Sequence, residues 1–139
     1  MSFLLDTNIL SELRKAKRCD RGVAEWFSSI DDDELFLSVL TVGELRRGIA
    51  LIQRRDPKSA SHLDNWLHGI IDRFQERILP IDKKIAEEWG RLSSRRTLPV
   101  IDGLLAATAR VHGLSLVTRN TKDVAGTGVA HLNPFSTAG

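Results

Sequence analysis

Four acidic residues of this 139-residue sequence stand where carboxylates could do chemistry: Asp6, Glu44, Asp102 and Asp123. Asp6 directly follows a short apolar run that is typical of a buried strand. In open α/β sheets ligands bind beyond the carboxyl ends of the strands, which is the place predicted for Asp6. Asp123 comes five residues after another predicted strand, and Glu44 and Asp102 lie at the start of two predicted helices.

Each acid taken alone also has a purely structural explanation. Asp6 is suited to cap the helix that follows it. Thr41 and Glu44 have the spacing of a capping box, in which Glu44 would bond back to the Thr41 amide. A helix dipole favours Asp102, although capping alone does not require its apolar surroundings or the adjacent glycine. Asp123 follows a strand, where acids are common for turn reasons.

The four acids are more informative as a set. If they meet at one edge of a sheet, the unneutralised carboxylates repel one another and raise one another's pKa values. A divalent cation removes this conflict, and oxygen ligands without histidine or cysteine suit Mg²⁺ or Mn²⁺. The four histidines are scattered along the sequence and indicate no zinc cluster. Because such an ion can activate water for displacement at phosphorus, the set predicts metal-dependent phosphodiester hydrolysis.

The elements that must position these acids alternate between strand and helix, which favours an α/β fold with a largely parallel sheet. Apolar runs predict strands over residues 3–5, 35–39, 78–81 and 114–118, with a possible short strand over 129–132. Helical spacing predicts helices over residues 9–13, 20–30, 41–54, 63–74, 82–92 and 101–112, and a loop-like tail from Asp123 onward. Pro80 indicates an edge or terminal position for its strand, and Asp82 is interpreted as a helix N-cap.

The composition limits the class of protein. The chain is 42% hydrophobic and 27% charged, which is typical of a globular protein, and its length predicts one domain over residues 1–139. The formal net charge of +2 permits a polyanionic partner without requiring one. The single cysteine, Cys19, cannot form an internal disulfide, and no run reaches the roughly 18 apolar residues of a membrane helix. We expect a cytoplasmic protein with no membrane segment.

Four ordered blocks of the sequence resemble the PIN-domain family of the VapC type, and more narrowly its FitB-like branch. The resemblance covers nearly the whole chain. The matching residues are Asp6-Thr7-Asn8, then Ser38, Thr41, Glu44, Leu45 and Gly48, then Pro99, Asp102, Leu105, Ala106 and Ala107, and finally the block from Gly113 to Asp123. The chain departs from the family pattern at Val124, where an aromatic residue usually follows the fourth acid.

The resemblance implies a three-layer α/β/α PIN-like fold with a central, mainly parallel sheet of four to five strands. It implies a Mg²⁺- or Mn²⁺-dependent endoribonuclease acting on RNA, commonly a homodimer. Many members are toxins of type II toxin–antitoxin pairs, held inactive by a small DNA-binding antitoxin. By position, the catalytic metal ligands would be Asp6, Glu44, Asp102 and Asp123. Thr118 and Asn120 would orient water or ligands, while Thr7 and Asn8 would hold the loop after the first strand.

Two other functions compete with RNA hydrolysis. A binding module with a degenerate metal site is one alternative, although all four acids are present. An aspartate-nucleophile phosphatase also has an acid after its first strand, but it needs a second Asp two residues later, where this chain has Asn8. Four arginines near the acids in sequence are candidates for holding phosphates: Arg14, Arg46, Arg47 and Arg119.

Overall fold

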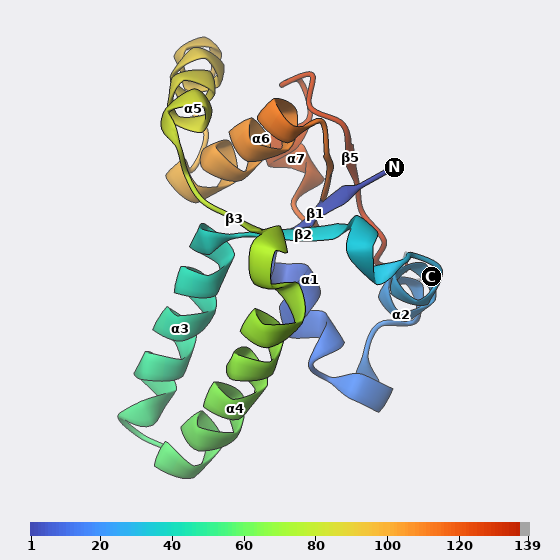
Figure 1. Ribbon diagram of the computed structural model, residues 1–139, viewed down its shortest axis with the longest axis vertical. Coiled ribbons are helices and arrows are strands. Elements are labelled where there is room, and N and C mark those ends of the chain that lie inside the picture. Colours follow the sequence, from blue (N-terminus) through green and yellow to red (C-terminus); the bar gives the residue numbers. More distant parts are fainter. Residues whose placement is uncertain (137–139) are drawn as a thin grey trace.

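The computed structural model describes residues 1–136, which form a parallel sheet between two layers of helices (Figure 1). The strands of the described chain are β1 (Phe3–Leu5), β2 (Leu35–Ser38), β3 (Ile78–Leu79), β4 (Ser115–Val117) and β5 (His131–Leu132). Their order across the sheet is β3-β2-β1-β4-β5, and each neighbouring pair is parallel. The predicted three-layer α/β/α fold with a mainly parallel sheet is confirmed.

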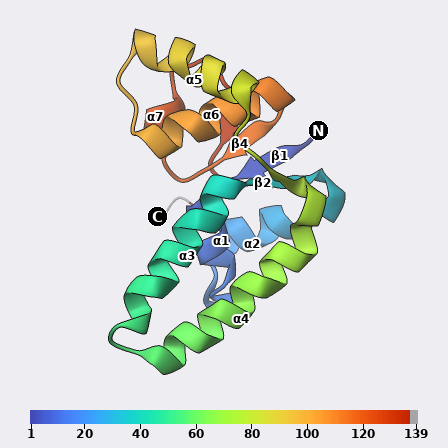
Figure 2. The same cartoon turned by 60° about the vertical axis from the view of Figure 1, so that its left-hand side comes forward.

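Helices cover both faces of the sheet. The α-helices are α1 (Thr7–Leu13), α2 (Arg21–Ser28), α3 (Val39–Gln53), α4 (Pro57–Phe74), α5 (Lys83–Arg95), α6 (Val100–His112) and α7 (Thr121–Val124). The first four lie on one face, where α3 and α4 run side by side and project beyond the sheet (Figures 1 and 2). The last three lie on the opposite face (Figure 1). No helix within residues 1–136 is both long and apolar enough to cross a membrane.

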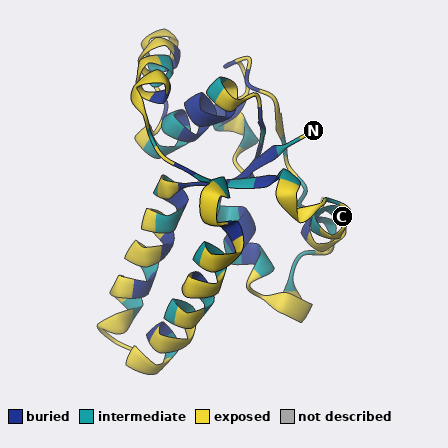
Figure 3. Ribbon diagram, in the orientation of Figure 1, coloured by how far each residue is buried: buried dark blue, intermediate teal, exposed yellow. Residues whose placement is uncertain are grey.

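The sheet separates two apolar cores. Alternate side chains of a strand point to opposite faces, so the short run of β1 supplies both cores. Leu5 packs with Leu37, Leu67 and other buried residues of the α1–α4 layer. Leu4 belongs to the second core, which the α5–α7 layer completes. The central strand β1 is therefore buried on both faces, as its dark ribbon shows (Figure 3), and this explains its entirely apolar sequence, whereas the edge strand β5 is partly exposed.

Local sequence signals predicted most elements correctly, but several elements begin or end at residues other than the predicted ones. β3 is an edge strand, as Pro80 predicted, because proline cannot donate to a further strand. Asp82 accepts a hydrogen bond from the Ile85 amide and caps α5, also as predicted. The prediction that a helix begins at Thr41 was wrong: α3 begins at Val39, and Ser38 is its N-cap through a bond from the Leu40 amide.

The segment after β4 also differs from its prediction. Residues 121–124, expected to be part of a loop, form the short helix α7. Its last residue, Val124, is 3% exposed and packs in the core of the α5–α7 layer. A single buried apolar residue in four gave no periodic pattern, so the sequence did not indicate this helix.

The strand order creates one point where the chain changes direction across the sheet. The strands β1, β2 and β3 follow one another towards one edge, whereas β4 and β5 lie on the other side of β1. The carboxyl ends of β1 and β4 are therefore adjacent, and their following segments diverge. In open α/β sheets such a switch point is the usual place for a ligand site.

Candidate active site

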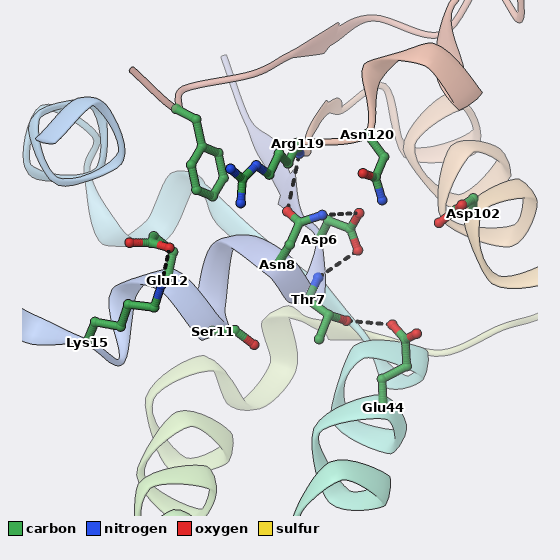
Figure 4. A pocket seen from close by; sticks show the side chains of 11 residues that line it. Asp6, Thr7, Asn8, Ser11, Glu12, Lys15, Glu44, Asp102, Arg119 and Asn120 are labelled. Carbon is green, nitrogen blue, oxygen red and sulfur yellow. Dashed lines mark hydrogen bonds and ion pairs between the residues drawn. The ribbon is translucent and has the colours of Figure 1, made fainter. Parts of the chain in front are cut away.

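An open cavity of about 420 Å³ lies at this switch point (Figure 4). Three predicted acids line it: Asp6 after β1, Glu44 from α3 and Asp102 from α6. Asn120, which follows β4, contributes to the same wall, together with Thr7 and Asn8. These residues come from segments as far apart in sequence as Asp6 and Asn120, so the cavity is a product of the strand order.

Asp6 is the most firmly held of the acids. Its residue is 6% exposed, and its carboxylate accepts hydrogen bonds from the Thr7 amide at 2.7 Å, the Asn8 side-chain amide at 3.3 Å and the Thr118 hydroxyl at 2.7 Å. Asp6 is also the N-cap of α1. The two interpretations of Asp6 from sequence therefore coincide: the cap fixes the carboxylate at the floor of the cavity.

Thr118 connects the ends of the two central strands. Its hydroxyl donates to Asp6 and accepts a hydrogen bond from the Asn120 amide at 3.0 Å. Thr118 is 1% exposed, so this bond is shielded from water. It couples the position of the first acid to the segment after β4. The Asn8 Nδ2 group donates to Asp6 and cannot act as the acid that a phosphatase mechanism would need at this position.

Glu44 does not form the predicted capping box. Because α3 begins at Val39, Glu44 is the sixth residue of the helix and lies beyond its first turn. Its carboxylate instead accepts a hydrogen bond of 2.5 Å from the Thr7 hydroxyl, 37 positions away (Figure 4). Thr7 thereby joins the loop after β1 to α3 and turns Glu44 towards the cavity.

Asp102 is the electrostatic centre of the acids. The pKa of Asp102 is raised to about 6. Burial is the largest cause, and the charges of Asp6 and Asp123, a hydrogen bond with Asp123 and the charge of Glu44 add to it in that order. The other three predicted acids therefore all act on Asp102, as carboxylates do when they share a site. Asp123 lies on α7 beside Asp102 but is not part of the cavity wall.

The glycine next to Asp102 has a packing explanation. A Cβ on Gly103 would lie 3.1 Å from two atoms of the Trp89 indole, closer than nearly all real contacts of that kind. Trp89 belongs to α5, which packs along α6. The glycine thus permits the close approach of the two helices that sets the start of α6, and with it Asp102.

The acids fit a hard divalent cation by their chemistry, though not as a preformed cage. Within residues 1–136 no group of three or more His, Cys, Asp or Glu side chains is arranged to hold a metal ion directly. Among the same residues none of the four acids forms an ion pair with a lysine, arginine or histidine. Their charges are therefore not neutralised by an ion pair within these residues. Mg²⁺ commonly keeps several waters and takes only one or two carboxylates, which suits acids spaced around an open cavity.

Sequence reasoning missed part of the cavity wall. Its wall also contains two residues of α1, one residue shortly after this helix and one near the C-terminus: Ser11, Glu12, Lys15 and Phe135. Apart from Ser11, which follows the Asp6-Thr7-Asn8 block of the family resemblance, no motif marked them, and Phe135 in particular comes from a segment predicted to be a loop. Of the four candidate arginines only Arg119 reaches this cavity; Arg46 forms an ion pair with Asp64 at 2.7 Å instead.

The sheet, the switch-point cavity and the acids together define an α/β domain with an acidic ligand site. The PIN domain family model matches residues 3–125 of the chain. Toxin FitB of Neisseria gonorrhoeae is 35% identical, with 95% of this chain and 97% of that protein covered. VapC ribonuclease Y4jK of Sinorhizobium fredii is 34% identical, with 97% of this chain and 99% of that protein covered.

A solved structure agrees with these sequence matches. The crystal structure of FitAcB from Neisseria gonorrhoeae contains a chain that matches with a TM-score of 0.88 and 34% identity, covering 95% of this chain and 97% of that one. The chain therefore belongs to the PIN-domain family, in the branch that includes FitB and VapC proteins. The resemblance inferred from the four sequence blocks is confirmed.

Proposed function

We propose that this protein is a metal-dependent endoribonuclease that hydrolyses RNA phosphodiester bonds, and that it is the toxin of a type II toxin–antitoxin pair. The observation that carries the proposal is the gathering of acids at the switch-point cavity, where burial and then the neighbouring carboxylates raise the pKa of Asp102 to about 6. No lysine, arginine or histidine of residues 1–136 forms an ion pair with these acids, so the site is suited to a cation from outside. Relatives named as a ribonuclease and a toxin support the assignment of substrate and role.

The cation that fits this site is Mg²⁺ or Mn²⁺, because both prefer carboxylate and water oxygens. We assign Asp6, Asp102 and Glu44 as its ligands, directly or through water, with Asp123 completing the acidic set. When bound, the ion supplies positive charge for the phosphodiester and lowers the pKa of water so that it can attack phosphorus.

Hydrogen bonds from neighbouring residues fix the positions of Asp6 and Glu44. Thr118 and Asn8 donate hydrogen bonds to one oxygen of Asp6, which leaves the carboxylate in a fixed orientation. The Thr7 hydroxyl holds Glu44. Asn120, whose backbone is tied to Thr118 and whose residue lines the cavity, is placed to orient water or the RNA backbone. Such outer contacts typically change metal affinity or activity about 10- to 100-fold when removed.

The partners follow from the same proposal. We expect the chain to act as one PIN domain over residues 1–139, as a homodimer, in the cytoplasm, where its RNA substrate is found. We also expect a small DNA-binding antitoxin to hold it inactive. Co-expression with the product of an adjacent small gene, followed by co-purification and loss of RNA cleavage, tests this expectation.

The decisive experiment compares the wild type with Asp6→Asn on total RNA, with Mg²⁺ or Mn²⁺ and with EDTA. Asn retains one capping oxygen, so the variant is expected to fold while losing charge at the floor of the cavity. Asp82→Asn is the matched control, because Asp82 also caps a helix after a strand but does not line the cavity. Cleavage is expected from the wild type and the control only, and only with metal. Equal cleavage by Asp6→Asn, or cleavage in EDTA, contradicts the proposal.

A further inference from the structure

The switch-point cavity has a second end that the acids do not explain. Besides the carboxylates, its wall contains two cationic side chains, Lys15 and Arg119. Lys15 already forms an ion pair of 2.9 Å with Glu12. For Arg119 no carboxylate of residues 1–136 lies within ion-pair distance. Arg119 is thus the cation of this wall whose charge the described chain leaves uncompensated.

Arg119 is tied to the acidic end through a single side chain. The Asn8 Oδ1 atom accepts a hydrogen bond from the Arg119 amide at 3.2 Å, while its Nδ2 group donates to Asp6 at 3.3 Å. Figure 4 shows both bonds, with the Arg119 guanidinium on the side of the cavity away from Asp102. Asn8 therefore sets the spacing between the first acid and the backbone that carries the arginine.

The guanidinium itself rests on an aromatic ring. The Arg119 Cζ atom lies 4.6 Å from the centre of the Phe135 ring, a cation–π contact. This contact limits where the long side chain can go. The side chain remains accessible away from the ring, because the residue is exposed and the cavity is open.

Phe135 is held in turn by the docking of the C-terminal segment on α2. The Ser136 amide and hydroxyl donate to the Asp20 carboxylate at 2.9 and 2.5 Å. Gly22 lies under this segment so closely that a Cβ there would be 2.4 Å from the Pro134 carbonyl oxygen. The ring beneath Arg119 is therefore fixed by contacts made more than 100 positions away in sequence.

These observations point to a ligand with a negative charge. A guanidinium presents a planar fork of donors that matches the oxygens of a phosphate, and fixing the fork in advance lowers the entropy lost on binding. The acidic end of the cavity repels an RNA strand unless a cation is bound there. A fixed positive group next to it offsets that repulsion for the neighbouring part of the strand.

We propose that Arg119 binds the RNA backbone phosphate next to the phosphodiester that is cleaved, with Phe135 as its positioning residue. The inference rests on the proposed ribonuclease function. It assigns the cavity two adjacent subsites, one for the scissile phosphate at the acids and one for a flanking phosphate at Arg119. The contact is to the backbone and therefore contributes affinity and register without selecting a base.

Binding without cleavage tests the charge of Arg119. Fluorescent single-stranded RNA of mixed sequence is titrated in EDTA at several salt concentrations. Arg119→Gln is expected to weaken binding about tenfold, as loss of a charge-assisted contact does. The slope of log K against log salt is expected to become shallower by about 0.7, the value for one phosphate contact on a single strand. Arg54→Gln removes the same charge from the exposed end of α3 and is expected to leave both quantities unchanged.

A modified RNA tests which phosphate is bound. In this RNA one uncharged methylphosphonate replaces the linkage beside the cleaved one, on either side in turn. At one of the two positions the wild type is expected to lose about as much affinity as Arg119→Gln loses on unmodified RNA. At that position Arg119→Gln is expected to lose nothing further, because the two changes remove the same contact.

Variants of Phe135 test the positioning role. Phe135→Leu leaves the charge of Arg119 in place, so we expect the salt slope to persist while KM for RNA cleavage rises several-fold and kcat changes little. Phe135→Tyr restores the ring and is expected to restore KM. A salt slope for Arg119→Gln equal to that of the wild type, or additive losses with both methylphosphonates, overturns the assignment.

The experiments distinguish a failure of the Arg119 assignment from a failure of the ribonuclease proposal. If the wild type cleaves RNA and Arg119→Gln binds and cleaves it equally well, the flanking-phosphate site is wrong and the ribonuclease proposal stands. If RNA binding depends on Arg119 as described but no metal supports cleavage, Arg119 remains a phosphate contact, while its place beside a cleaved phosphodiester and the ribonuclease proposal are both wrong.

Discussion

Asp20 and Asp102 lie at the N-terminal ends of two helices, yet the fold moves their pKa values in opposite directions. Hydrogen bonds from the Ser136 hydroxyl and amide, followed by the bonds from α2, lower the pKa of Asp20 to about 2. Burial and the neighbouring acids raise the pKa of Asp102 to about 6. A helix dipole favours a carboxylate at both places, so the difference comes from tertiary contacts.

The two acids illustrate how a structural carboxylate differs from a functional one. Asp20 is surrounded by donors of the chain and secures the C-terminal segment on α2. Asp102 is surrounded by other acids, an arrangement that costs folding free energy whenever all of them are ionised. A costly cluster in a cavity is the more informative sign of a binding site. Three predictions test this contrast.

The largest expected difference is in RNA cleavage. Asp102→Asn is expected to lower kcat/KM at least about 100-fold, because it removes a proposed ligand of the catalytic cation. Asp20→Asn is expected to stay within a few-fold of the wild type, since its effect reaches the cavity only through Phe135. Cleavage rates at saturating Mn²⁺ measure both. Similar losses in the two variants would remove the functional distinction between the acids.

The second expected difference is in the pH dependence of metal binding. A carboxylate must lose its proton to bind a cation, so protons and metal compete for Asp102 below about pH 6. We expect Mn²⁺ to bind about tenfold more weakly at pH 5 than at pH 8, measured by calorimetry without RNA. Asp20 titrates far below this range and is expected to have no influence. A pH-independent affinity in the wild type would contradict the raised pKa of Asp102.

The smallest expected effects are on thermal stability, and they have opposite signs. For Asp102 the folded pKa lies above the ordinary 3.8, so its charge destabilises the fold fully above about pH 6 and not at all below about pH 4. Asp102→Asn in EDTA is therefore expected to melt at a higher temperature than the wild type at pH 8 and at the same temperature near pH 4.

For Asp20 the folded pKa lies below 3.8, so its stabilising contribution is complete above about pH 4 and disappears as the pH falls towards 2. Asp20→Asn is expected to melt at a lower temperature than the wild type at pH 8, with a difference that shrinks below pH 4. Scanning calorimetry of both variants over this range gives the sign of each effect. Shifts of the same sign at pH 8 would contradict the contrast between the two acids.

Local sequence patterns predicted most of the fold because the forces involved are themselves local. Apolar runs identified the strands, Pro80 identified the edge strand, and Asp82 identified a helix start. The prediction was wrong for the start of α3, where Ser38 rather than Thr41 caps the helix. Both residues are good N-caps, and the choice between them depends on where β2 stops pairing with its neighbours.

The site was predicted less completely than the fold. The four family acids were found from their positions, and the structure places three of them in one cavity with Asp123 beside Asp102. The sequence did not indicate that Glu44 is held by Thr7, nor that Phe135 lies under Arg119. These contacts join residues 37 and 16 positions apart, on elements whose separation in space no local pattern describes.

The sequence by itself determined which residues are acidic, which segments form strands and helices, and the family to which the chain belongs. Only the tertiary structure decided which acids lie close enough to repel one another, which acids accept hydrogen bonds from the chain, and that Arg119 has no carboxylate partner among the described residues. The physical reason is that charge interactions depend on distance in space and on burial, and both are set by the strand order and by the packing of the helices on the sheet.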